Sequence, residues 1–235
     1  MTSSAAPTRR LTGISSMATR ALLTDLAADY QARHGIELAV ESVGGVDAAQ
    51  RVQAGEAFDF VVLAADAIDR LIASGQVLAG SRVDLVHSGV AVAVQAGAPR
   101  PDIGSECALR EAVLAARSIG HSTGPSGVQL LRLFQRWGLA DRLQDRLVQA
   151  PPGVPVATLV ARGEAELGFQ QLSELIHAKG IAVLGPLPPA VQIRTTFSAG
   201  IGARSAQGAA VGALLFFLAS PAATAAKQRH GMDPT

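Results

Sequence analysis

The chain has little of what metal, redox and nucleic-acid sites are usually made from. Its 235 residues contain one cysteine, Cys107, which excludes an internal disulfide. The five histidines are scattered singly, so we expect no bound metal and no cofactor. A net charge of +1 without a basic cluster argues against nucleic acid and anionic membranes as partners. An aromatic content of 4% argues against stacking on bases or sugars.

A secretion leader and a membrane span are also missing from the sequence pattern. Residues 1–13 include two arginines but no apolar stretch of the kind that signal peptides have. We therefore expect a periplasmic protein if a leader has been trimmed, and a cytoplasmic one if Met1 is the native start. The apolar run 209–219 is too short to cross a membrane and is soon followed by Pro221, so we expect a buried helix there.

What the sequence does contain is a regular alternation of strand and helix patterns. Strands are expected at residues 11–14, 36–42 and 58–63, and each is followed by a helical pattern. Two longer strand patterns, 83–94 and 191–201, enclose the middle of the chain. This order predicts an α/β protein of two doubly wound lobes joined by two crossing strands, and we expect a monomer. The predicted lobes are residues 9–85 plus 195–235 (lobe I) and residues 86–194 (lobe II).

The clearest functional pattern lies in residues 119–137. An apolar run ends in the turn HSTGPSG, and a helical pattern follows whose predicted N-cap is Ser126. Free main-chain N–H groups and the positive end of the helix dipole make such a turn an anion site. Similar turns follow two earlier strands, at Ser15-Ser16 and at Gly44-Gly45.

The three turns share one position in the predicted fold, the carboxyl end of a strand. Each of these residues, taken alone, is equally consistent with a helix cap or a turn, because the same residue types are favoured there. We also expect Asp47, Asp66 and Ser173 to cap helices. Ligands of doubly wound sheets bind at the carboxyl ends of the strands, so the recurrence of these turns favours one shared anion pocket.

Longer blocks of the sequence resemble the periplasmic molybdate-binding proteins of ABC transporters. The blocks are SSMATRALLTDLAADYQARHGIELAVES, QAGEAFDFVVLAAD, ARGEAELGF and the C-terminal ASPAA, within a similarity that runs from about Leu11 to Pro234. The resemblance implies a type II periplasmic-binding-protein fold, in which two lobes close around an oxyanion held by hydroxyl and N–H groups without a countercharge. It places Ser16 on the family's first-turn serine and Ser126 in the turn before its long helix. It also implies an ABC transporter permease as a partner.

Two departures from that family change the expected ligand. The second turn reads Val43-Gly44-Gly45-Val46 where the family has serines, and Gln170-Gln171 stand where it has a tyrosine. Each missing hydrogen bond to a charge is worth ~1.5–3 kcal/mol, which puts molybdate itself in doubt. The two amides and several hydroxyls suit a larger ligand with carboxylates. One enzyme of this family, aconitate isomerase, moves a double bond between trans- and cis-aconitate, and the ISSMA and SVGGVDAA stretches resemble that branch.

Two functions are therefore expected. The first is a solute-binding receptor that holds a small anion, an oxyanion or a di- or tricarboxylate, in a cleft between the lobes. Its expected binding residues are Ser15, Ser16, Gly44, Gly45, Ser122, Thr123, Ser126, Gly127, Gln170 and Gln171. The alternative is an aconitate isomerase on the same scaffold.

The isomerase alternative requires a base to remove an allylic proton and an acid to return one. His121 is the candidate for this role because it directly precedes the hydroxyl-rich turn. A lone histidine at a strand end more often only makes a hydrogen bond of its own. His87 fits a hinge better than a catalytic site, and Glu41 and Asp66 are acidic residues at or just after the ends of strands.

Overall fold

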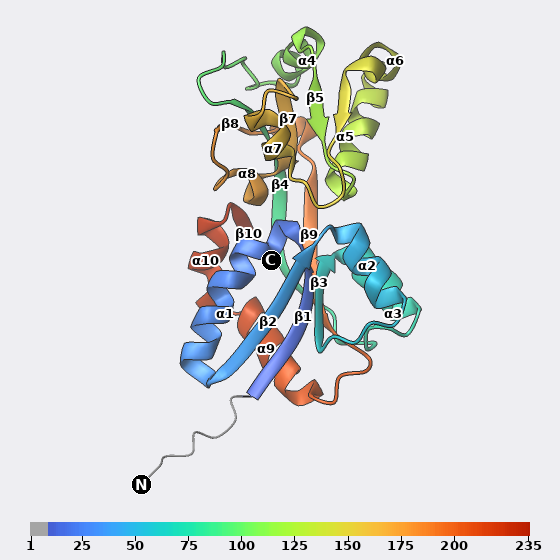
Figure 1. The fold of residues 1–235 in the computed structure, drawn as a ribbon, viewed down its shortest axis with the longest axis vertical. Helices are drawn as coiled ribbons and strands as arrows, with labels where there is room; N and C mark the ends of the chain where they lie inside the picture. Colours follow the sequence, from blue (N-terminus) through green and yellow to red (C-terminus); the bar gives the residue numbers. More distant parts are fainter. Residues whose placement is uncertain (1–8) are drawn as a thin grey trace. The chain divides into compact units, whose positions relative to one another are not determined.

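The chain is divided into two compact units. The computed structural model describes residues 9–235, so the expectation about a leader falls partly outside the described residues. Unit 1 runs to Val86 and resumes at Thr196, and unit 2 comprises His87–Thr195. The strands β4 (Val83–Gln95) and β9 (Arg194–Ile201) carry the chain from one unit into the other (Figure 1).

Unit 1 begins with three strand–helix pairs in succession. Its elements besides β4 and β9 are β1 (Arg9–Ser16), the 3-10 turn η1 (Met17–Thr19), α1 (Arg20–His34), β2 (Ile36–Val43), α2 (Gly45–Gln53), β3 (Phe60–Ala64), α3 (Ala65–Ala73), α9 (Gly208–Ala219), the 3-10 turn η4 (Pro221–Ala223), α10 (Thr224–Arg229) and β10 (Met232–Pro234). β1 is parallel to β2 and to β3, and β9 is antiparallel to β3. The three predicted strands are confirmed, and the carboxyl ends of these parallel strands lie at the same edge of the sheet.

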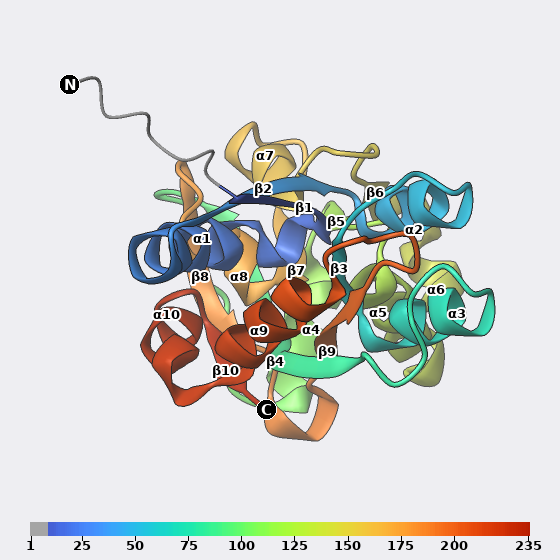
Figure 2. The ribbon, with the colours of Figure 1, turned by 90° about the horizontal axis from the view of Figure 1, so that it is seen from below.

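Helices cover both faces of the unit 1 sheet. Phe60 and Val62 of β3 belong to the core cluster of α1 and α9, whereas Val61 and Leu63 belong to the cluster of α2 and α3. This division follows from the alternation of side chains along a strand. Figure 2 shows α1, α9 and α10 on one side of the sheet and α2 and α3 on the other. A strand that is buried on both faces needs a continuous apolar sequence, which is why β3 was recognisable.

Unit 2 has a mixed sheet. Its elements besides β4 and β9 are α4 (Glu106–Ala115), β5 (Ile119–His121), α5 (Pro125–Arg136), α6 (Ala140–Leu143), the 3-10 turn η2 (Gln144–Arg146), β6 (Leu147–Gln149), α7 (Val156–Ala161), β7 (Leu167–Gln171), α8 (Leu172–Leu175), β8 (Ile181–Pro186) and the 3-10 turn η3 (Pro189–Val191). β5 is parallel to β6 and β7, and β4 is antiparallel to β7 and β8. The α/β fold class predicted from the sequence is confirmed.

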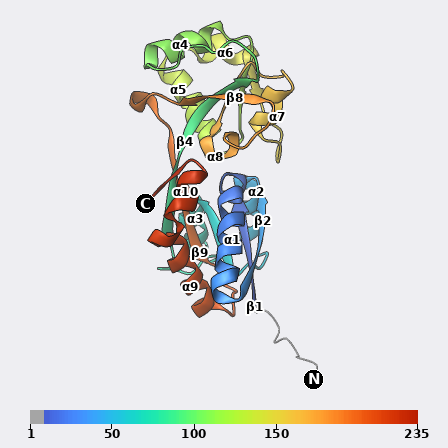
Figure 3. The same ribbon diagram turned by 90° about the vertical axis from the view of Figure 1, so that its left-hand side faces the viewer.

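The two faces of the unit 2 sheet are packed differently. On one face Phe169 of β7 meets Phe134 of α5 edge to face, with ring centroids 6.1 Å apart. On the other face α7 packs closely on β5 and β7, because Gly120 and Gly168 leave room for the side chains of α7. A Cβ at Gly168 would overlap Val160. Figure 3 shows α7 and α8 on one side of β4 and β8, and α5 on the other.

The predicted helix caps were wrong. The caps of α2, α3, α5 and α8 are Gly44, Ala64, Gly124 and Gln171, and none of them makes a side-chain capping bond. Asp47, Asp66, Ser126 and Ser173 lie inside the first turns instead. α2, α3 and α8 follow their strands with at most one residue between them, and α5 begins at Pro125, so each helix starts before the residue whose type favours capping. α4, by contrast, is capped by Ser105, whose Oγ accepts from the Ala108 N–H over 3.1 Å.

The C-terminal apolar run forms the buried helix that the sequence predicts, α9. In the part of the chain that the structure describes, no single helix is long and apolar enough to cross a membrane. Only together are α9 and the segment Pro221–Arg229 long and apolar enough for a membrane span, and the pair is bent by 58° between them. Most of the hydrophobic side chains of α9 belong to the core of unit 1.

Candidate functional site

In unit 1, the anion-binding turn predicted from the sequence is formed by Ser16 and Gly45. Ser16 ends β1 and is 6% exposed, and its Oγ has no hydrogen-bond partner among residues 9–235. A Cβ placed on Gly45 would lie 3.5 Å from the Cβ of Ser16, so the two residues adjoin. The first helical bond of α2 joins the Ala48 N–H to the Gly44 carbonyl over 2.8 Å. The earlier N–H groups of α2 therefore precede its hydrogen-bond ladder and can donate to an anion.

Ser15 lies beside this turn but is used differently. It is fully buried, and its Oγ is 2.7 Å from the Oγ of Ser42 on β2. This hydroxyl pair ties together the carboxyl ends of β1 and β2, where Ser15 and Ser42 are in register. Ser42 was not identified from the sequence. The ligand contact predicted for Ser15 stays a prediction, and its hydroxyl already has a protein partner.

In unit 2, the turn between β5 and α5 brings Ser122, Ser126 and Gly127 together. The Oγ atoms of Ser122 and Ser126 are 3.2 Å apart, and Ser126 is 6% exposed. The first helical bond of α5 joins the Val128 N–H to the Gly124 carbonyl over 3.1 Å, so the N–H groups of Ser126 and Gly127 precede the ladder. Thr123, which was predicted as a donor, is exposed. This turn therefore offers hydroxyl and main-chain N–H donors to an anion.

The shape of this turn depends on Gly127. A Cβ at Gly127 would overlap the main-chain carbonyl of Ser122 and would lie 3.2 Å from the Ser122 Oγ. We expect Gly127→Ala to lower the free energy of unfolding by ~1–3 kcal/mol, as for other overpacking substitutions. Urea denaturation measures this change. The matched control is Gly212→Ala in α9, where a Cβ meets no atom within 4 Å. Because alanine favours helix, the control should raise stability by ~0.5–1 kcal/mol, and an equal response from both variants would contradict the prediction.

The two consecutive amides at the end of β7 face opposite sides of the sheet. Gln171 pairs with Val90 and Gln170 with Ala91 of β4. Gln171 is 3% exposed; its Nε2 donates to the Thr195 Oγ1 over 2.8 Å, and its Oε1 has no partner among the described residues. Both polar atoms of the Gln170 side chain have partners within unit 2, since its Oε1 accepts from the Ala157 N–H over 3.3 Å and its Nε2 donates to Glu174 over 2.7 Å. Gln171 is thus the better placed of the two to bind a ligand.

Glu174 is a titratable group that the sequence did not reveal. It lies in α8, three residues after β7 ends, and it is half-buried. Its Oε2 accepts from Gln170, while its Oε1 accepts no hydrogen bond from any residue between 9 and 235. Burial raises the pKa of Glu174 to about 7, although the hydrogen bond from Gln170 acts in the opposite direction. A carboxyl group with this pKa can both take and return a proton at neutral pH.

The raised pKa of Glu174 predicts how stability depends on pH. The ordinary pKa of a glutamate is 4.5, and in the folded chain it is about 7, so between these values the folded state binds more protons than the unfolded state. The contribution of Glu174 to the free energy of unfolding is therefore fully present below pH ~4.5 and is lost as the pH rises through about 7. We expect Glu174→Gln to flatten this part of the stability profile, measured as the urea midpoint between pH 5 and pH 8. Identical slopes for the wild type and the variant would contradict the assignment.

The other candidates for proton transfer have less suitable surroundings. His121 is 4% exposed and its Nδ1–H donates to the Ser122 carbonyl over 3.1 Å. Burial lowers the pKa of His121, so it is a neutral and weak base; its catalytic role stays a prediction. Glu41 is an exposed partner of Arg51, at 2.5 and 2.9 Å, which lowers the pKa of Glu41. Asp66 is an exposed partner of Arg70.

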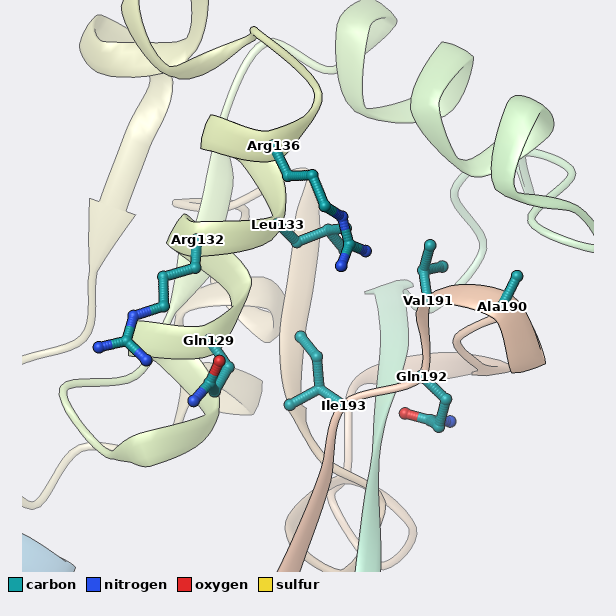
Figure 4. Close-up of a pocket in the computed structure, with 8 residues that line it drawn as sticks. All are labelled: Gln129, Arg132, Leu133, Arg136, Ala190, Val191, Gln192 and Ile193. Atoms are coloured by element: carbon teal, nitrogen blue, oxygen red, sulfur yellow. The ribbon is translucent and has the colours of Figure 1, made fainter.

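Unit 2 also has a hollow that is separate from these residues. Its volume is 340 Å³, and its lining residues are Gln129, Arg132, Leu133, Arg136, Ala190, Val191, Gln192 and Ile193. Figure 4 shows Arg136 pointing towards Val191, whereas Arg132 points away on the other side of the helix. The Gln192 amide is already bonded to the Val90 N–H and the Leu187 carbonyl. Both arginines are exposed. The hollow therefore lacks buried groups that would select a ligand.

The structure thus places the predicted residues in two groups. Ser16 and Gly45 adjoin in unit 1, and Ser122, Ser126 and Gly127 adjoin in unit 2. The idea that both groups serve one ligand stays a prediction. Among residues 9–235 no cluster of three or more His, Cys, Asp or Glu side chains could hold a metal ion.

The sequence of the chain matches a known family over most of its length. Residues 11–233 match the family described as bacterial extracellular solute-binding protein. The chain is also 39% identical to an aconitate isomerase from Pseudomonas sp., over 98% of this chain and 90% of that protein. These findings confirm the resemblance to molybdate-binding-like proteins and to the aconitate isomerase branch that the sequence blocks indicated.

The fold is shared with solved binding proteins. The periplasmic molybdate-binding protein of Azotobacter vinelandii superimposes with a TM-score of 0.79 at 23% identity, over 94% of this chain and 98% of that one. The sulfate-binding protein SubI of Mycobacterium tuberculosis H37Rv gives a TM-score of 0.74 at 15% identity, over 97% of this chain and 87% of that one. At these identities the likeness concerns the fold alone. By its sequence and its fold, this chain belongs to the bacterial extracellular solute-binding protein family.

Proposed function

We propose that this chain is an aconitate isomerase. The observation that carries the proposal is its 39% identity to such an enzyme over 98% of the chain. The donors described above support it, because hydroxyl, amide and main-chain N–H groups suit a ligand with several carboxylates. Gln171, at a position where molybdate-binding proteins have a tyrosine, fits a flat carboxylate better than a tetrahedral oxyanion.

The proposed reaction is a 1,3-proton shift. A base removes one proton from the methylene group of trans-aconitate, and the electron pair left behind forms a new double bond to the central carbon. The former double bond shifts its electrons to the former vinyl carbon, which takes up a proton and becomes the new methylene group. No proton or electron is gained or lost overall. The intermediate carries extra negative charge in its carboxylates, and fixed hydrogen-bond donors stabilise such charge.

Glu174 is the group whose chemistry best fits the base. Its Oε1 accepts no hydrogen bond from the part of the chain that the structure describes, and the amide of Gln170 donates to its other oxygen over 2.7 Å. A base with a pKa near the working pH is the most effective, because it is ionised when substrate binds and still basic enough to take the proton. The same group can return the proton on the other side of the allyl system. In this proposal the hydroxyl-rich turn of unit 2 binds a carboxylate, and Glu174 moves the proton.

The test is turnover in heavy water. The purified chain is incubated with trans-aconitate in D₂O, and proton NMR follows both the appearance of cis-aconitate and the loss of methylene and vinyl protons by exchange. Aconitate isomerase activity predicts both signals. Absence of conversion and of exchange, with saturating substrate bound, would refute the proposal.

The alternative function is a receptor for a small anion. The N–H groups that precede the hydrogen-bond ladders of α2 and α5 favour it, because such helix ends bind oxyanions without a countercharge. A receptor would work in the periplasm with an ABC transporter permease as its partner, whereas an enzyme requires neither. Thermal shift with molybdate, sulfate and aconitate separates the two functions, since a ligand at ~100 Kd adds ~2.7 kcal/mol to stability. A shift with aconitate but no turnover would favour a carboxylate receptor.

A further inference from the structure

Ser88 is a buried polar residue of the strand β4. Ser88 is 0% exposed, and its Oγ has no partner within residues 9–235. An unpaired buried hydroxyl costs about 1–3 kcal/mol in desolvation, so proteins rarely keep one without a use. Ser88 follows His87 in a strand whose next residues, from Val90 to Val94, are all buried and apolar. A serine in this position therefore needs an explanation.

The register of the sheet places Ser88 at the ligand edge of unit 2. Val90 is paired with Gln171, the last residue of β7, and the two strands are antiparallel. Ser88, two residues before Val90, therefore lies just beyond the carboxyl end of β7. Side chains two residues apart on a strand share a face, so Ser88 is on the face of Val90 and Gln171. That is the edge at which ligands of α/β sheets bind.

The side chain of Gln171 reaches across the same face. β4 lies between β7 and β9 in the sheet, and the Gln171 Nε2 reaches the Thr195 Oγ1 on β9 over 2.8 Å. The amide therefore passes over β4, which carries Ser88. The Gln171 Oε1 is the second polar atom here that is buried and unpartnered in the described chain. Two such atoms on one face, at one edge, indicate a place that a ligand completes.

We propose that Ser88 and Gln171 together bind one carboxylate of the substrate, an inference that rests on the function proposed above. The Thr195 hydroxyl can donate as well as accept, so the amide of Gln171 can turn over without losing this bond. The Thr195 hydroxyl then donates to Oε1, and Nε2 is free to donate to the ligand. Ser88 supplies the second donor through its hydroxyl. Both unpartnered atoms are satisfied, and the carboxylate is held by neutral donors alone.

The experiment compares Ser88→Ala with a matched control, Ser198→Ala. Ser198 is also 0% exposed, but its Oγ donates to the Asp84 Oδ1 over 2.6 Å. Calorimetry measures the affinity for tricarballylate, the saturated analogue with the same three carboxylates, and thermal unfolding measures stability. We expect Ser88→Ala to weaken tricarballylate binding about 10- to 100-fold with an unchanged or higher Tm. Ser198→Ala should lower the Tm and leave the affinity unchanged.

Two dicarboxylates identify the group that is bound. Glutarate lacks the central carboxylate of tricarballylate, and methylsuccinate lacks a terminal one. If Ser88 and Gln171 bind the central carboxylate, the effect of Ser88→Ala should vanish for glutarate and persist for methylsuccinate. If they bind a terminal carboxylate, the effect should persist for both. An unchanged affinity for tricarballylate, as expected if Ser88 and Gln171 only hold a water molecule, would overturn the proposal.

The outcomes also separate this inference from the proposed function. If the wild-type chain binds tricarballylate but does not convert aconitate, the isomerase proposal is wrong and the proposed carboxylate site can still be tested with Ser88→Ala. If the wild-type chain converts aconitate but Ser88→Ala does not change the affinity for tricarballylate, the isomerase proposal stands and the proposed carboxylate site is wrong. A chain that binds no tricarboxylate would overturn both.

Discussion

Replacing Glu174 with glutamine is expected to lower kcat for trans-aconitate about 10²- to 10⁴-fold, the usual contribution of a general base. Glutamine has nearly the same shape, and its Oε1 can accept the hydrogen bond that Gln170 donates to the carboxylate over 2.7 Å. The affinity for tricarballylate should therefore stay within about twofold, and the loss should be confined to turnover. Initial rates, measured by the formation of cis-aconitate, and calorimetric affinities check the two halves of this prediction.

The pH profile makes the assignment specific. Because burial raises the pKa of Glu174 to about 7, the wild-type rate should rise with pH through this value and then level off, as the base becomes ionised. The residual activity of Glu174→Gln should lack this step. Glu164→Gln is the control, since Glu164 is an exposed partner of Arg162 at 3.8 Å in the same unit. If Glu174→Gln kept its kcat and the separate variant His121→Gln were inactive, His121 and not Glu174 would be the group that transfers the proton.

The strands were predictable because their side chains follow simple rules of burial. β3 is apolar along its whole length, since it is covered on both faces. The end of α1 was predictable for another reason, because Gly35 follows it in the left-handed region with a φ of 68°. The caps were not predictable in the same way. Residue preferences for capping presuppose a loop before the helix, whereas Ala64 and Gly44 pass directly from a strand into a helix.

The candidate site was only half visible in the sequence for a related reason. Ser16, Ser126 and Gly127 lie in turns whose composition is distinctive by itself. Ser88 and Glu174 have no such local signal. Whether Ser88 lacks a hydrogen bond depends on the strands that flank β4, and the pKa of Glu174 depends on burial by segments distant in the chain.

Replacing Gln171 with glutamate is expected to weaken tricarballylate binding at pH 8 by about 10³-fold. The exchange keeps the length of the side chain and its bond to Thr195, whose hydroxyl can donate to a carboxylate. It removes the N–H donor, worth ~1.5–3 kcal/mol towards a charged acceptor. It also adds a like charge, which costs ~4 kcal/mol at about 4 Å for an effective dielectric constant of about 20. If half of the repulsion is relieved by movement of the ligand, the two effects together amount to ~3.5–5 kcal/mol, a loss of about 4 × 10²- to 5 × 10³-fold.

Lowering the pH should restore part of this affinity, because a buried glutamate next to bound carboxylates takes up a proton readily. The ratio of wild-type to variant affinity should therefore shrink between pH 8 and pH 5.5. Gln95→Glu is the control for a general effect of charge, since Gln95 ends β4, is exposed and donates to the Ala161 carbonyl over 3.0 Å. If Gln95→Glu weakened binding as much as Gln171→Glu, net charge rather than contact would explain both results. A loss confined to Gln171→Glu requires its amide to lie against a carboxylate of the ligand.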